Sequence, residues 1–287
     1  RIKMLKDILT RVGDDEKAVS KFTFDTNLNN GGWGTNEDAN EELHKILEKQ
    51  YIFSYSKPVR LIAKLIQTIN NRDAIILDFF SGSATTAHAV MQLNAEDGGK
   101  RKFIMVQLPE KTDEKSEAFK AGYKNICEIG KERIRRAGEK IKEEAGLNGQ
   151  DLDIGFRVLK LDSSNMKDIY YSADEYDQGM LENMQSNTKE DRTDLDLLFG
   201  CLVDWGLELD KPYTTKEING HKVHIYNDGD LVACFEKDLD MKTIDEIAKL
   251  QALRVVFSDN SFVDSATKIN VAEHFKMIAP DTDIKVI

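Results

Sequence analysis

The sequence has few residues of the kinds that build disulfide scaffolds, metal centres or membrane spans. Its three cysteines, Cys127, Cys201 and Cys234, lie far apart and form no Cys-x-x-Cys or Cys/His spacing. This pattern predicts a reducing compartment and no structural metal. No apolar run approaches the roughly 20 residues that cross a bilayer, and the first residues, Arg1-Ile2-Lys3-Met4, contain no apolar signal core. We therefore expect a cytoplasmic protein that has no membrane partner.

Several common motifs of catalysis and ligand binding are also missing. The chain contains no Pro-Pro pair, no G-x-G-x-x-G sequence and no P-loop lysine. His221 and His224 lie close together on an expected strand, but two histidines with no third ligand are weak evidence for a metal. The sequence therefore predicts no metal site. Because both glycine-rich motifs are absent, it gives no sign of a dinucleotide-binding or P-loop enzyme.

The charge of the chain is divided unequally between its two halves. The net charge is −11. Residues 151–287 hold 28 acidic and 15 basic residues, or −13, whereas residues 1–150 hold 23 and 25, or +2. An acidic surface repels the phosphates of nucleic acids. We therefore expect the second half to face away from DNA or to contact another protein.

Residues 74–91 read Ala-Ile-Ile-Leu-Asp-Phe-Phe-Ser-Gly-Ser-Ala-Thr-Thr-Ala-His-Ala-Val-Met. An apolar run ending at Asp78, a loop of small residues and an apolar segment from Thr85 predict a strand, a tight turn and a helix. Gly82 lets backbone approach a ligand closely, and the unpaired N–H groups at a helix start favour an electron-rich or anionic partner. Because the loop has only one glycine, the pattern alone fits a plain strand-to-helix turn with small residues for packing as well as it fits a ligand-binding loop.

Segments on either side of this stretch add a family resemblance. Upstream lies Phe53-Ser54-Tyr55-Ser56-Lys57-Pro58-Val59-Arg60-Leu61-Ile62, and downstream lies Lys100-Arg101-Lys102-Phe103-Ile104-Met105-Val106-Gln107-Leu108-Pro109-Glu110. Together the three segments resemble the S-adenosylmethionine region of amino-methyltransferases that act on DNA. The closest resemblance is to the modification subunits of type III restriction systems, and it continues through residues 112–118 to Lys131-Glu132-Arg133-Ile134-Arg135-Arg136. Ala84 departs from the pattern, because many members have a second glycine there, and alanine resists a positive φ angle.

The resemblance implies which residues bind the cofactor, S-adenosyl-L-methionine. Lys57 would contact the methionine carboxylate, since a lysine at a helix start is otherwise unfavourable. Asp78 would receive the cofactor's ammonium group, and Phe80 would pack on the cofactor, which leaves Phe79 for the core. Gln107 or its rival Glu110 would take the ribose hydroxyls. The full predicted set is Lys57, Asp78, Phe80, Ser81, Gly82, Ser83, Thr85, Gln107 and Glu110. His88 is expected to be a packed side chain rather than a catalyst.

The resemblance also implies a longer enzyme. Methyltransferases of this class hold the target amino group with an Asp-Pro-Pro-Tyr-like tetrapeptide, and this chain has no such sequence. We therefore expect the chain to be the C-terminal part of an adenine-specific DNA methyltransferase, with no catalytic residue of its own. Through the full-length protein it would act on double-stranded DNA and assemble with a second modification subunit and a restriction subunit. Adenine rather than cytosine rests on the resemblance alone.

The expected fold class is α/β. Residues 1–50 would end a target-recognition or linker region, with a helix up to about residue 21. Residues 51–149 would form part of a Rossmann-like methyltransferase sheet, and residues 150–287 an acidic C-terminal α/β domain. In the first half, residues 115–145 predict one helix or two broken near Gly122. Their cluster Lys131, Arg133, Arg135 and Arg136 is interpreted as a solvated face with helix ion pairs.

The second half predicts a strand over 155–161, a helix after residue 194 and a hairpin that pairs 221–226 with 231–235. A helix over 243–252, a strand over 254–257, a helix over 264–276 and a strand over 284–287 would follow. Two other functions are compatible with parts of the sequence. The chain would alternatively be a non-catalytic interaction module whose acidic domain binds another modification or restriction subunit. A nicotinamide-dependent oxidoreductase is disfavoured by the loop and by Gln107, where an acidic residue is typical.

Overall fold

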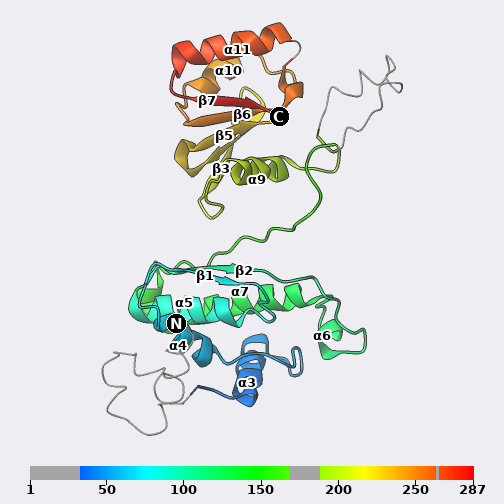
Figure 1. The fold of residues 1–287 in the computed structure, drawn as a ribbon, viewed down its shortest axis with the longest axis vertical. Coiled ribbons are helices and arrows are strands. Elements are labelled where there is room, and N and C mark those ends of the chain that lie inside the picture. The colour runs from blue at the N-terminus through cyan, green and yellow to red at the C-terminus, as the bar shows by residue number, and fades with distance from the viewer. Residues whose placement is uncertain (1–32, 168–187, 263–264) are drawn as a thin grey trace. The chain divides into compact units, whose positions relative to one another are not determined.

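The computed structural model describes residues 33–167, 188–262 and 265–287 (Figure 1). The chain divides into two compact units, Arg1–Gly155 and Phe156–Ile287. The helix expected up to about residue 21 lies outside the described residues. None of the helices in the described ranges combines the length and apolar character that crossing a membrane requires.

Two short helices precede the sheet of the first unit. Helix α3 (Asn36–Leu47) begins at Thr35, whose hydroxyl accepts from the backbone of Asp38 while the Asp38 carboxylate accepts from the backbone of Thr35. This reciprocal capping stabilises the first turn, and the expected inward residues of α3, Leu43, Ile46 and Leu47, are buried. Helix α4 (Val59–Gln67) begins directly after Pro58, which fits the fixed backbone angle of proline.

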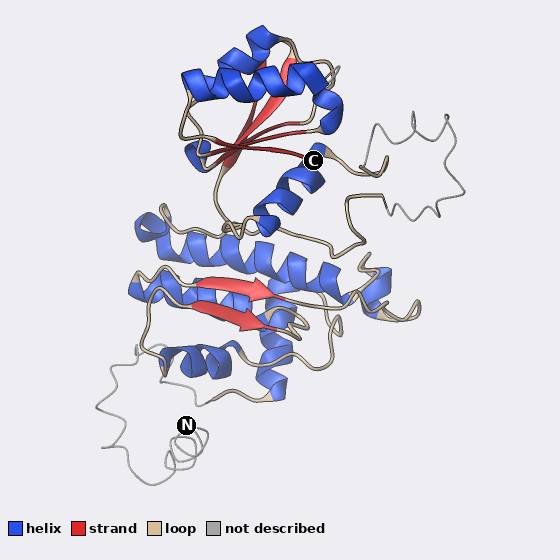
Figure 2. Cartoon of the chain, turned by 45° about the horizontal axis from the view of Figure 1, so that its top comes forward, coloured by secondary structure: helices blue, strands red, loops and turns tan. Residues whose placement is uncertain are grey.

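The central stretch forms the strand, turn and helix that its pattern predicts. Strand β1 (Ile75–Asp78) leads through a loop into helix α5 (Thr85–Asp97), and the chain returns as strand β2 (Lys102–Met105). The two strands are parallel, with Ile75 opposite Lys102 and Asp78 opposite Met105 (Figure 2). Because both strands end at the same edge, the loops after Asp78 and after Met105 lie side by side.

Helices cover one face of this sheet and leave the other open among the described residues. Ile76 and Phe103 pack against a core formed by α4 and α5. Their neighbours point the other way, and Ile75, Leu77 and Ile104 are 63%, 49% and 50% exposed. Parallel sheets normally have both faces covered, and two strands alone are marginally stable. The open apolar face is therefore unusual for a complete sheet.

The charged region after β2 forms two helices, as one of the two predicted alternatives has it. Helix α6 (Glu117–Lys120) ends before Gly122, which has a φ angle of +96°, and helix α7 (Ile126–Ala145) follows. The expected ion pairs along α7 are present. They join Lys131 to Glu128 at 2.6 Å and both Arg135 and Arg136 to Glu132, at 3.4 and 2.7 Å. A short 3-10 helix, Gly146–Gly149, ends this part of the unit.

The second unit is built around a five-stranded sheet in the order β3-β4-β5-β6-β7. Its first three strands are antiparallel and its last three parallel. In chain order the elements are α9 (Asp194–Asp204), β3 (Tyr213–Ile218), β4 (His221–Tyr226), β5 (Leu231–Cys234), α10 (Met241–Ala248), β6 (Arg254–Phe257), α11 (Ser265–Ile278) and β7 (Asp283–Val286). One core of this unit lies against α10 and α11, and the other against α9.

The predicted pairing of β4 with β5 is confirmed, with Tyr226 opposite Leu231. Strand β3 was not predicted, although Asn219 and Gly220 supply a usable signal. Both residues have positive φ angles, 51° and 87°, as the tight turn between β3 and β4 requires.

The strand predicted over residues 155–161 is wrong. Among the described residues this segment joins no ladder, and its apolar side chains Val158, Leu159 and Leu161 are exposed. Its anchor is Arg157, whose guanidinium lies over the rings of Phe199 and Tyr213 and donates to backbone carbonyls. The alternation of apolar residues in this segment therefore does not arise from pairing in a sheet.

The two faces of the β1–β2 sheet provide a matched test. Replacing Ile76 by threonine places a hydroxyl against the helices and should lower the free energy of unfolding of the first unit by about 1–2 kcal/mol. The same replacement at Ile75, whose side chain is mostly exposed, should change it by less than about 0.5 kcal/mol. Urea denaturation followed by circular dichroism measures both. Equal losses would mean that helices do not cover the Ile76 face selectively.

Candidate functional site

The loop between β1 and α5 is organised by Asp78. One carboxylate oxygen of Asp78 accepts from the Phe80 backbone N–H at 3.1 Å, and the other accepts from the Thr86 hydroxyl at 2.6 Å. Asp78 thus joins the end of the strand to the first turn of the helix across the loop. A carboxylate has about four acceptor positions, so these two bonds leave capacity for a cationic ligand group.

The end of the neighbouring strand holds the same loop from its other side. The Ser81 N–H donates to the Val106 carbonyl at 3.2 Å, and the Gly82 N–H donates to Oε1 of Gln107 at 2.8 Å. Gln107 in turn donates from Nε2 to the Leu108 carbonyl at 3.2 Å. The predicted ribose ligand Gln107 is therefore also a support of the loop.

The loop contains two consecutive turns through left-handed backbone. Gly82 has a φ angle of +51° and Ala84 one of +60°. Glycine reaches this region freely, whereas alanine does so at a cost of roughly 1 kcal/mol. Ala84 is buried, and its backbone N–H donates to the Ser81 carbonyl at 2.7 Å. The departure from the two-glycine pattern is thus accommodated by an alanine held in a conformation that glycine would adopt more easily.

A buried arginine ties this loop to two other segments. From helix α7, Arg133 directs Nη1 at three hydroxyl oxygens, those of Ser56, Ser83 and Thr85, at 3.0, 2.9 and 2.7 Å. The Ser56 and Ser83 hydroxyls are also 3.0 Å apart. Three stretches that are far apart in the sequence, at residues 56, 83–85 and 133, therefore meet at one nitrogen.

The interpretation of Arg133 as part of a solvated face is wrong, because its relative exposure is 0%. The signal was present in the sequence. Ile129, Arg133, Ala137 and Ile141 recur every four residues along α7 and form its buried stripe. The charged residues next to Arg133 form ion pairs along the helix, and Arg133 was therefore grouped with them rather than with the apolar residues at four-residue spacing.

The surroundings of Arg133 leave its charge uncompensated. Its Nε and Nη2 atoms have no hydrogen-bond partner among the described residues. Burial lowers the pKa of Arg133 to about 10, and the charge of Glu42 opposes this shift, so the guanidinium stays charged at neutral pH. His88, one turn into α5, is also buried, and burial together with the charges of Arg133 and Lys140 lowers its pKa to about 3. His88 is therefore neutral above about pH 4.

The other predicted residues are distributed around the loop. Lys57 is exposed, directly after buried Ser56, and Glu110 is exposed beyond the end of β2. Phe80 is 84% exposed, while Ser83 and Thr85 are buried and turned toward Arg133. The expectation that Phe79 enters the core is wrong, since it is 64% exposed and lies beyond the last strand residue.

These residues fit the amino acid end of S-adenosylmethionine. An exposed aromatic ring, a carboxylate with free acceptor capacity and an exposed lysine border one loop. Arg133, with its uncompensated charge and its two unpartnered nitrogens Nε and Nη2, bonds to residues of this loop from helix α7. Sequence reasoning missed Arg133, Ser56 and Thr86, which fix the loop from behind rather than border it.

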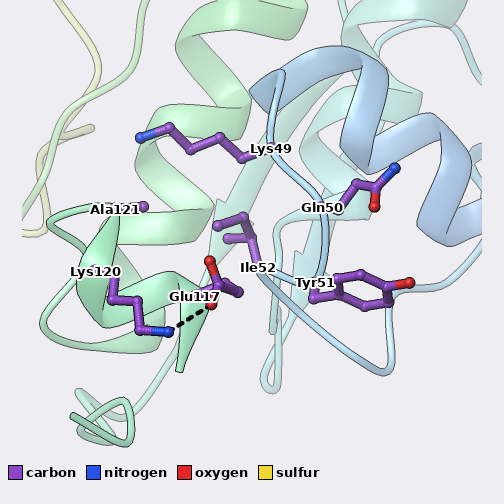
Figure 3. Close-up of a pocket in the computed structure, with 7 residues that line it drawn as sticks. All are labelled: Lys49, Gln50, Tyr51, Ile52, Glu117, Lys120 and Ala121. Carbon is purple, nitrogen blue, oxygen red and sulfur yellow. Dashed lines mark hydrogen bonds and ion pairs between the residues drawn. The ribbon is translucent and has the colours of Figure 1, made fainter. Parts of the chain in front are cut away.

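A separate cavity of about 390 Å³ lies elsewhere in the first unit (Figure 3). It is lined by residues 49–52 and by Glu117, Lys120 and Ala121, and the ion pair between Lys120 and Glu117 crosses its wall at 2.7 Å. None of the nine predicted cofactor residues borders this cavity. It therefore contributes nothing to the site at the loop.

Comparison with known proteins shows what the first unit of this chain is similar to. A family model described as DNA methylase matches residues 14–139, which include the loop, Lys57 and Arg133. The match covers the segments that meet at Arg133 and stops before the second unit.

Individual relatives narrow the similarity to one kind of DNA methyltransferase subunit. The chain is 36% identical over 162 residues to the type III restriction-modification enzyme StyLTI Mod subunit of Salmonella typhimurium, covering 54% of this chain and 24% of that protein. It is 30% identical over 255 residues to the EcoP15I Mod subunit of Escherichia coli, covering 86% of this chain and 37% of the relative. The chain is also 39% identical over 121 residues to the EcoPI Mod subunit of Escherichia phage P1, covering 42% of this chain and 18% of that protein. The resemblance to type III modification subunits is thus confirmed, and the chain spans between 18% and 37% of the length of these three relatives.

The lowered pKa of His88 predicts acid sensitivity. The unfolded chain binds a proton at His88 below about pH 6.5 while the folded chain does not until about pH 3. Stability is therefore lost as the pH falls through this window, by about 2 kcal/mol at pH 5. We expect His88→Gln to remove this part of the loss. Urea denaturation at pH 7.5 and 5 measures it, with the remaining histidines cancelling in the comparison. Parallel pH dependences of the two proteins would contradict the assignment.

Proposed function

We propose that this chain forms the cofactor-binding part of an adenine-specific DNA methyltransferase, the modification subunit of a type III restriction-modification system. The observation that carries the proposal is the meeting of three sequence segments at one loop. Ser56, beside Lys57, and Ser83 and Thr85 in the loop are joined through Nη1 of Arg133. Similarity to Mod subunits over 86% of the chain supports the same function.

Each residue at the loop would have a distinct role toward S-adenosylmethionine. Asp78 would accept the ammonium group, and Lys57 would meet the carboxylate. Phe80 would lie against the cofactor, and Gln107 or Glu110 would bond the ribose. The bound cofactor supplies an activated methyl group for the exocyclic amine of adenine. That amine is paired inside the duplex, so the base must leave the stack before it reacts. The contribution of these residues is orientation of the methyl donor.

The open sheet face supports a larger fold than the described residues contain. We propose that β1 and β2 belong to a Rossmann-like sheet whose remaining strands come from the rest of a longer polypeptide. The exposed Ile75, Leu77 and Ile104 would then be covered. The same missing part would carry the Asp-Pro-Pro-Tyr-like tetrapeptide and the adenine pocket. This chain alone would bind cofactor weakly and would not methylate DNA.

Calorimetric titration with S-adenosylmethionine tests the cofactor site. We expect saturable binding that weakens about tenfold or more in Asp78→Asn, because the variant keeps two acceptor lone pairs but loses the charge that attracts the ammonium group. Lys57→Ala should weaken binding several-fold. Asp73→Ala and Lys45→Ala, at exposed positions outside the loop and the segments that contact it, are the matched controls. Absence of saturable binding at millimolar cofactor would overturn the proposal for this chain.

The charge of the second half favours a role in assembly. Residues 151–287 have a net charge of −13, which disfavours contact with DNA phosphates. We propose that this unit binds a restriction subunit or a second modification subunit. Sedimentation velocity of the chain with purified restriction subunit should show a complex at 50 mM salt that weakens at 500 mM, since screening shortens electrostatic attraction. Migration as separate species at both salt concentrations, with itself and with the restriction subunit, would exclude the role.

A further inference from the structure

Arg133 is the largest fully buried side chain of the described residues, and its charge has no counter-ion at bonding distance there. The one carboxylate that raises its pKa appreciably, Glu42, is itself hydrogen-bonded to the Val59 backbone N–H at 3.0 Å. The protein groups that contact Arg133 are neutral hydroxyls. Burying a charge without an ionic partner generally costs several kilocalories per mole. Packing alone therefore does not explain why an arginine occupies this position.

The hydrogen-bond geometry supplies the second observation. Nη1 carries two hydrogens, yet three hydroxyl oxygens lie within 3.0 Å of it. The remaining guanidinium donors on Nε and Nη2 bond to nothing described. The guanidinium as a whole thus has more donors than described acceptors, and its charge has no described counter-ion, an imbalance that a nearby anion offsets.

Arg133 also lies close to the N-terminus of a helix. Thr85 is the first residue of the 13-residue helix α5, whose N-terminus carries a partial positive charge. Arg133 therefore places a full positive charge behind a helix end that is already positive. The neighbouring His88 is neutral and adds no counter-charge. Two positive charges at one place repel each other, and a negative group beside them relieves that repulsion.

We propose that Arg133 is a positioning residue that makes this loop selective for the carboxylate of the cofactor's amino acid end. The inference rests on the proposed cofactor function. Arg133 donates to Ser83 and Thr85, which orients their own hydroxyl hydrogens away from the guanidinium. The buried hydroxyls hold the first turn of α5 in place, and the N–H groups of that turn then present donors to the anion. Arg133 also fixes Ser56, and so holds Lys57 beside the same loop.

The test uses two ligands that differ only in the carboxylate, S-adenosylmethionine and its decarboxylated form. The measured quantity is the ratio of their dissociation constants for each variant of the 287-residue chain. Arg133→Gln keeps hydrogen-bonding capacity but removes the charge, whereas Arg133→Lys keeps the charge but has fewer directed donors. Arg135→Gln, whose parent side chain is exposed on the same helix and pairs with Glu132, is the matched control.

We expect the wild-type chain to favour S-adenosylmethionine, and Arg133→Gln to reduce that preference about tenfold. Arg133→Lys should weaken both ligands but keep most of the preference, and Arg135→Gln should change neither quantity. An unchanged preference in Arg133→Gln, with both ligands weakened equally, would overturn the inference and leave Arg133 a purely structural residue. Failure of the wild-type chain to bind either ligand would instead overturn the proposed function.

A second variant covers the case in which Arg133→Gln does not fold. Thr85→Val preserves the shape of the residue but removes the hydroxyl that lies between the guanidinium and the helix start, 2.7 Å from Nη1. We expect the preference for S-adenosylmethionine to fall about threefold in this variant. Thermal unfolding monitored by circular dichroism confirms the fold of each variant, and an unchanged preference in folded Thr85→Val would contradict the inference.

Discussion

The first unit depends on a buried guanidinium that is shared among three hydroxyls. Arg133 reaches from α7 to the segment before α4 and to the start of α5. Helix α7 also lies close to the loop itself, since a Cβ atom at Gly130 would be 3.4 Å from the Gly82 carbonyl oxygen. A larger residue there would push against loop backbone. The position of α7 therefore sets the loop, and the loop sets which donors face a ligand.

Asp78 and Arg133 hold the same loop from opposite directions. Asp78 bonds the loop backbone at Phe80 and the helix at Thr86, while Arg133 bonds the hydroxyls of Ser83 and Thr85. The loop thus has a carboxylate on one side and a guanidinium behind it. A zwitterionic ligand end, with one ammonium and one carboxylate, matches this separation of charge. A ligand of a single sign would satisfy only one of the two.

The sequence predicted what depends on local pattern and missed what depends on burial. The strand, turn and helix at residues 75–97 followed from an apolar run, small residues and helical periodicity. The inward position of Arg133 was missed because its ionic neighbours made the whole helix look solvated, although its spacing from Ile129 and Ala137 is that of the buried stripe. Phe79 was misplaced because it was assigned to the core once Phe80 was given to the cofactor, whereas the chain already turns after Asp78 and leaves both rings exposed. Strand β3 was missed although its Asn-Gly turn is a strong hairpin signal. The signals for Arg133 and β3 were therefore present in the sequence, whereas the exposure of Phe79 depends on neighbours that a single sequence does not contain.

The open sheet face and the ordered loop together separate the two halves of the proposed reaction. Every hydrogen bond described for the loop comes from residues between Ser56 and Arg133, all of them in the first unit. None depends on a group that would cover Ile75, Leu77 or Ile104. The donor side of the site is therefore preorganised before any acceptor part packs on the sheet. In the proposed arrangement the covering part would need only to place the adenine, because Asp78 and Arg133 would already set the orientation of the methyl donor.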